Sequence, residues 1–158
     1  MQQTKLRGSV LLLIVGILMI IAGAFGVIIS LLLGASGAIL NGTVQSADLA
    51  EIMDQLNAIL AQYNLSADVL AKAITTITIL LVVSAILDIV FGILGIAFRN
   101  KAEKANLLFI FGIILVLVSL AGSFLPVIMF KAGFSIGSFL ISLVLPVLYV
   151  VGAALNKS

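Results

Sequence analysis

The sequence contains no cysteine, no histidine and no tryptophan among its 158 residues. Without cysteine and histidine the chain cannot form disulfides, Cys/His zinc sites or a haem ligated by either residue. Catalytic units of the Ser-His-Asp or Cys-His type are excluded for the same reason. The chain also lacks a glycine-rich phosphate-binding motif. We therefore expect a protein that is not an enzyme and carries no metal or cofactor, and the missing cysteines favour a bacterial source.

Charged residues are scarce as well, at 9% of the chain against 63% hydrophobic residues. A soluble domain usually carries about 25% charged residues, and a small one cannot hide so much apolar surface. The composition therefore predicts a membrane protein whose main partner is the lipid bilayer. The net charge is +2 and the cations are scattered along the chain, so we expect no nucleic-acid partner.

Four apolar runs are long enough to cross a bilayer, which takes about 20 helical residues. They predict spans at about residues 9–33, 75–98, 105–125 and 134–155. We expect an all-α transmembrane four-helix bundle that forms a single domain over residues 1–158. The first run stays apolar to Leu40, so its helix either tilts, projects past the membrane, or ends near Gly34 and Gly37. It exceeds the apolar core of a secretory signal, and we expect it to be retained as a span.

The segment 41–70 interrupts the apolar character with a predicted amphipathic helix. Apolar residues recur at helical spacing from Leu49 to Tyr63. Its other face carries three acids, Asp48, Glu51 and Asp54. Either this helix caps the ends of the spans, or its acidic face is a surface for a protein partner. A second helix start is expected at Ser66, with Asp68 in the first turn.

The positive charges predict the orientation of the chain in the membrane. Cytoplasmic loops of membrane proteins are enriched in Lys and Arg. Six cations fall on one predicted side: Lys5, Arg7, Arg99, Lys101, Lys104 and Lys157. Only Lys72 and Lys131 fall on the other side. We therefore expect both termini to be cytoplasmic and the loop 34–72 to be extracytoplasmic.

Small residues recur along the spans at spacings that favour close helix packing. Every seventh position of the first span is small, at Ser9, Gly16, Gly23, Ser30 and Gly37. Gly26 adds a further small residue four positions after Ala22. In the later spans the predicted packing residues are Gly92, Gly95, Gly133 and Gly137. These faces either hold the bundle together or contact another protein.

Asp88 is the one acid within a predicted span. It precedes Arg99 by about 11 residues, or ~16 Å at the helical rise, which is close to the bilayer midplane. The residues expected to surround it are Ser84 on its own helix, Ser119 on the third span, and Ser142, Pro146 and Tyr149 on the fourth. Pro146 is expected to kink its helix and to free the carbonyl of Ser142. A protonated Asp88 could donate a hydrogen bond to that carbonyl.

Two functions follow from these features. The missing catalytic chemistry and the helical insertion favour a non-enzymatic protein that acts through protein–protein interaction, as an accessory subunit, assembly factor or immunity-type protein. Its partner would be another protein or a second copy of the chain. Asp88 instead favours a small proton- or cation-coupled carrier, because acids within membranes commonly mark ion pathways.

Overall fold

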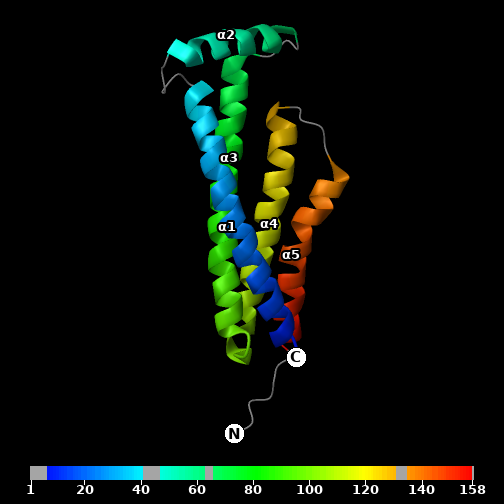
Figure 1. Ribbon diagram of the computed structural model, residues 1–158. Helices are drawn as coiled ribbons and strands as arrows, with labels where there is room; N and C mark the ends of the chain where they lie inside the picture. Colours follow the sequence, from blue (N-terminus) through cyan, green and yellow to red (C-terminus); the bar gives the residue numbers. More distant parts are fainter. Residues whose placement is uncertain (1–6, 41–46, 63–65, 131–134, 158) are drawn as a thin grey trace.

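The computed structural model describes residues 7–40, 47–62, 66–130 and 135–157. Within those residues helices are the only regular secondary structure (Figure 1). The elements are α1 (Ser9–Leu40), α2 (Ala47–Gln62), α3 (Ala67–Phe98), the short 3-10 helix η1 (Ala102–Lys104), α4 (Ala105–Phe130) and α5 (Ile136–Leu155).

Four of these helices, α1, α3, α4 and α5, are long and apolar enough to cross a membrane. Only 17 to 28% of the residues in the most apolar stretch of each are buried within the molecule. A bilayer would cover the remaining apolar surface. Helices are suited to this environment because they satisfy their own backbone hydrogen bonds in lipid. The predicted all-α bundle of four spans, with a helix inserted between the first two, is confirmed.

The helices are longer than the predicted spans at three ends. α1 runs to Leu40 and α3 already begins at Ala67. Gly34 and Gly37 do not end α1, because both face α3: a Cβ on Gly37 would lie 3.3 Å from Ile74 Cγ2. The helix of α4 continues through Pro126 to Phe130, past the predicted end at 125. A proline removes only one backbone donor, so the helix can continue beyond it.

α1 and α3 form the most extensive contact in the bundle and lie side by side along their length (Figure 1). The five small residues at every seventh position of α1 are all buried. At the closest approach, a Cβ added to Gly16 would lie 2.7 Å from the carbonyl oxygen of Gly92. Backbone therefore meets backbone along this seam, which only small residues permit.

The hydrophobic core occupies the half of the bundle in which α1 begins and α5 ends. Its buried members are Leu12, Val15, Met19, Phe91, Leu108, Leu115, Tyr149 and Ala153. The Phe91 ring stacks on Phe111 with centroids 4.6 Å apart. The Tyr149 hydroxyl donates to the Phe91 carbonyl at 3.0 Å.

Two polar contacts hold the helix ends together at this same end. The Ser9 hydroxyl donates to the Asn100 side-chain oxygen at 2.5 Å. The Asn156 amide donates to the Arg99 carbonyl at 2.8 Å. These contacts place the start of α1 and the ends of α3 and α5 at one level. We call this end of the bundle the closed end, and the opposite end the open end.

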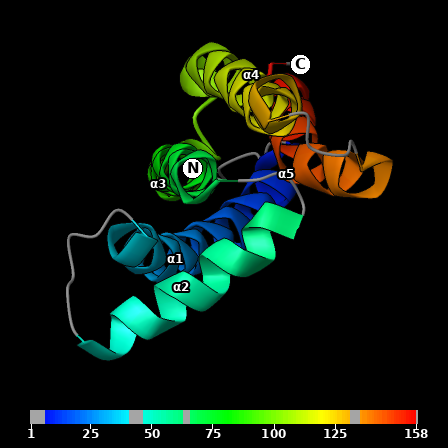
Figure 2. The same ribbon diagram turned by 90° about the horizontal axis from the view of Figure 1, so that it is seen from above.

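At the open end α2 lies across the tips of α1 and α3, as Figures 1 and 2 show. The predicted amphipathic helix is therefore present, but only part of its apolar face is covered. Leu60 is buried and Leu56 is half-buried, whereas Ile52 and Ile59 are 57% and 53% exposed. Ser66 caps α3 as predicted, because its hydroxyl accepts a hydrogen bond from the Val69 N–H at 3.3 Å.

Candidate functional site

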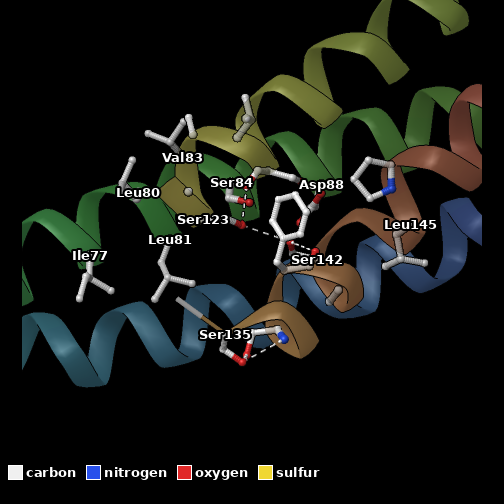
Figure 3. Close-up of a pocket in the computed structure, with 18 of the residues that line it drawn as sticks. Ile77, Leu80, Leu81, Val83, Ser84, Asp88, Ser123, Ser135, Ser142 and Leu145 are labelled. Carbon is white, nitrogen blue, oxygen red and sulfur yellow. Dashed lines mark hydrogen bonds between the residues drawn. The ribbon is translucent and has the colours of Figure 1, made fainter. Parts of the chain in front are cut away.

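A cavity of about 700 Å³ lies between α3, α4 and α5 in the half of the bundle toward the open end. Pockets that bind small molecules commonly have this size. Its polar lining residues are Ser84, Asp88, Ser119, Ser123, Ser135, Ser138 and Ser142. The other lining residues are apolar or glycine, and they include Pro146 at the deep end. In Figure 3 the polar side chains of Ser84, Asp88, Ser123 and Ser142 gather near the middle of the view.

The cavity forms because the first half of α5 diverges from the last turns of α4. Figure 1 shows the outer, orange half of α5 leaning away from α4. The predicted kink residue, Pro146, is buried within α5, and its missing N–H leaves the Ser142 carbonyl without its usual helical partner. A proline inside a helix is a common cause of such a bend.

Among the described residues that line the cavity, Asp88 is the only acid and none is a Lys or Arg. The side chain is half-buried. Across the described part of the chain, no residue forms a hydrogen bond or an ion pair with its carboxyl group. The carboxyl group is thus available to a bound molecule.

The serine hydroxyls of α4 and α5 are held by their own helices. Ser123 donates to the Ser119 carbonyl at 2.9 Å, and Ser142 donates to the Phe139 carbonyl at 2.8 Å. The two hydroxyl oxygens lie 3.4 Å apart across the cavity (Figure 3). This distance allows a hydrogen bond between the two hydroxyls, and each oxygen keeps a lone pair that can accept a hydrogen bond from a molecule in the cavity.

The structure brings most of the predicted polar site together. Ser84, Asp88, Ser119, Ser142 and Pro146 all line the one cavity. The predicted direct hydrogen bond from Asp88 to Ser142 is not formed, and the two residues instead share the wall of the cavity.

Tyr149 differs from the prediction. It is fully buried in the core, its hydroxyl is bonded to the Phe91 carbonyl, and it does not line the cavity. Its ring packs on Gly95, where an added Cβ would lie 2.7 Å from Tyr149 Cε2. Tyr149 therefore fastens α5 to α3 below the cavity.

Sequence reasoning missed Ser123 and Gly122 as lining residues. Ser119 and Ser123 are separated by four positions, so they share a face of α4, and this spacing could have identified the second serine. Nothing in the sequence distinguishes Gly122 from a packing glycine. In the structure a Cβ added to Gly122 would meet no atom within 4 Å, because the residue borders open space.

The glycines predicted to pack fall into two groups. Five of them lie where an added Cβ would meet a neighbouring helix at 3.0 Å or less: Gly16, Gly23, Gly26, Gly92 and Gly95. Gly137 is exposed, and a Cβ there would meet no atom within 4 Å, so within one chain it packs against nothing. Gly133 lies outside the described residues.

The predicted partner-facing acids belong to α2. Glu51 and Asp54 are exposed, and the side chain of Asp48 lies outside what the structure describes. Over the described residues, no group of three or more acidic side chains comes together as a metal site would require. None of the described residues that line the cavity of Asp88 belongs to α2.

No family model, curated protein or solved structure matches the chain. Its function therefore has to be inferred from the geometry of the chain itself.

Proposed function

We propose that the chain is a non-enzymatic multi-pass membrane protein that acts by binding another protein through α2, outside the bilayer. The observation that carries this proposal is the exposure of Ile52 and Ile59 on α2, a helix that we place beyond the hydrocarbon core. Acidic and apolar side chains share this surface, since Glu51 and Asp54 are exposed beside the isoleucines.

The lengths of the helices support this position of α2. α5 has 20 residues, which span ~30 Å, the thickness of the hydrocarbon core. α1 and α3 have 32 residues each and so span ~48 Å. Because the closed end holds all three at one level, α1 and α3 extend ~18 Å further than α5. A tilt of about 20°, which is average for membrane helices, shortens this projection only slightly.

Such a projection carries α2 past the headgroup layer, which adds about 5–8 Å on each side of the core. Ile52 and Ile59 then face water in the isolated chain. Two large apolar side chains exposed on one helix outside the membrane are typical of an interaction surface. An acidic helix is also a poor ligand for a membrane surface, since interfacial helices are usually rich in Lys and Arg.

The orientation that we propose places the closed end in the cytoplasm. Arg7, Arg99, Lys101, Lys104 and Lys157 all belong to this end. Positive charge flanking the spans favours the cytoplasmic side. Both termini would then be cytoplasmic, and α2 would be extracytoplasmic.

A photocrosslinking residue placed at Ile59 in the native membrane tests the partner surface. We expect it to form a discrete adduct with another protein, whose mass distinguishes a different chain from a second copy. The matched control is Ile14, which is 52% exposed on α1 within the span and should label only lipid. The double variant Ile52→Asn with Asp54→Asn should weaken the adduct, because it removes an apolar contact and a charge from the surface. Absence of any protein adduct at position 59, or the same adduct at position 14, would overturn the proposal.

The cavity favours a second candidate function, a small proton- or cation-coupled carrier that uses Asp88. The cavity occupies the outer half of the bundle, and the core closes the inner half below it. An outward-facing site in an alternating-access carrier would be open on one side and closed on the other in this way. Cation flux into sealed vesicles that is lost in Asp88→Asn would support the carrier, and flux equal to the native protein would rule it out.

A further inference from the structure

Several of the groups that face the cavity between α3, α4 and α5 are hydrogen-bond acceptors. Asp88 provides a carboxyl group without a protein partner among the described residues. The hydroxyls of Ser123 and Ser142 contact backbone carbonyls and each other, and their oxygens keep lone pairs. Pro146 leaves the Ser142 carbonyl without its helical donor. A molecule that satisfies these groups must bring positive charge or hydrogen-bond donors.

The size and the walls of the cavity exclude a bare inorganic ion as its best occupant. A single ion would leave most of the ~700 Å³ unfilled. The walls are mainly apolar, and they include Leu81, Val118 and the ring of Phe139. Apolar walls with a few convergent polar groups are typical of sites for organic molecules.

The position of Asp88 indicates where the positive charge of a bound ligand would lie in the cavity. Asp88 and Pro146 lie at the deep end, whereas Ile77, Val127 and Ser135 lie toward the open end. A lipid of the outer leaflet would place its headgroup at the mouth and its uncharged tail against Asp88. A molecule with a cationic centre that can reach the deep end satisfies the carboxylate instead, while its apolar body contacts the walls.

We propose that this cavity is a binding site for an organic cation with an apolar body, which pairs with the Asp88 carboxylate. Pairing offsets the unfavourable burial of either charge alone. An aromatic wall at Phe139 suits such a ligand, because cations are attracted to ring faces. The site is distinct from the α2 surface, so this proposal does not depend on whether α2 binds a partner. It requires that the cation binds, but not that the protein transports it.

The test uses two probes of the same shape and opposite charge, tetraphenylphosphonium and tetraphenylborate. Binding of each to the full-length protein in lipid nanodiscs is measured by equilibrium dialysis, with empty nanodiscs as background. We expect saturable binding of tetraphenylphosphonium that tetraphenylborate does not displace. Asp88→Asn should weaken binding about tenfold or more, as expected for the loss of one charged contact. Asp68→Asn is the matched control, because Asp68 is exposed in the first turn of α3 and should leave binding unchanged.

A second pair of variants tests the cavity without changing any charge. Gly122→Leu fills the cavity, and its new side chain enters open space, so the fold should tolerate it. Gly137→Leu is the control, because Gly137 also borders open space in a helix but does not line the cavity. We expect Gly122→Leu to abolish saturable binding and Gly137→Leu to retain it.

Three results would overturn the proposal. The first is equal affinity for tetraphenylphosphonium in the native protein and in Asp88→Asn. The second is retention of binding in Gly122→Leu. The third is the absence of saturable binding to native protein whose helicity and single-species elution show it to be folded. A lipid or a second copy that permanently fills the cavity would give this third result.

Discussion

Replacement of Gly16 by alanine tests the α1–α3 seam. The added Cβ would lie 2.7 Å from the Gly92 carbonyl oxygen and 2.7 Å from Ile96 Cγ1. Cβ atoms essentially never lie within 3.0 Å of such neighbours, so the helices must separate by several tenths of an ångström. The isoleucine can rotate, but the carbonyl is part of the α3 backbone and cannot move alone. Overpacking of this kind typically costs about 1–3 kcal/mol.

An intrinsic gain opposes that cost, because alanine is favoured over glycine in a helix by about 1 kcal/mol. Gly137→Ala isolates this gain, since a Cβ at Gly137 meets no atom within 4 Å. We therefore expect Gly137→Ala to be stabilising by about 0.5–1 kcal/mol. Gly16→Ala should be less stable than Gly137→Ala by about 1–3 kcal/mol.

Unfolding by sodium dodecyl sulfate in mixed micelles, followed by circular dichroism, measures both variants under one condition. Both variants add the same methyl group, at the interior of α1 in Gly16→Ala and in the first turn of α5 in Gly137→Ala. If Gly16→Ala proved as stable as Gly137→Ala, the close approach of α1 and α3 would be refuted. An equal loss of stability in both variants would contradict the open space at Gly137.

Three further substitutions test single contacts. Tyr149→Phe removes the hydrogen bond to the Phe91 carbonyl and should destabilise the bundle by about 1 kcal/mol, measured by the same unfolding assay; no change would show that the bond is absent. Asn156→Ala leaves the Arg99 carbonyl without its side-chain donor and should cost about 1–3 kcal/mol. Asn106→Ala, at an exposed position of α4, is its control and should change little. Ser66→Ala removes the cap of α3 and should speed amide exchange in its first turn, with a loss of about 1 kcal/mol; unchanged exchange at Val69 would contradict the cap.

The helices could be predicted from the sequence because the features that determine them are local. Long apolar runs define the spans, and the Ser66 start could be predicted because a capping hydroxyl acts within one turn. Helix ends were less accurate where tertiary contacts decide them. Gly34 and Gly37 resemble a stop, yet packing against α3 keeps them inside α1.

The site could be predicted in part. The distance from Arg99 placed Asp88 near the midplane, with Ser119, Ser142 and Pro146 expected around it, and these residues line one cavity. Depth does not specify direction around a helix, so Tyr149 was assigned to the same site although it points into the core. The cavity itself arises from the divergence of α5 from α4, which depends on the whole bundle and not on any local pattern.

The central claim, that α2 stands outside the bilayer on a projecting α1–α3 pair, is tested most directly by cysteine accessibility. The chain has no cysteine, so each introduced thiol is its only one. Single cysteines at Ser36 on α1 and Gln55 on α2, both exposed, should react with a membrane-impermeant maleimide added to intact cells. A cysteine at Leu18 should stay unreactive in lipid, and one at Lys101 should react only after the cells are permeabilised. If positions 36 and 55 were protected in intact cells while position 101 reacted, the proposed orientation and projection would both be contradicted.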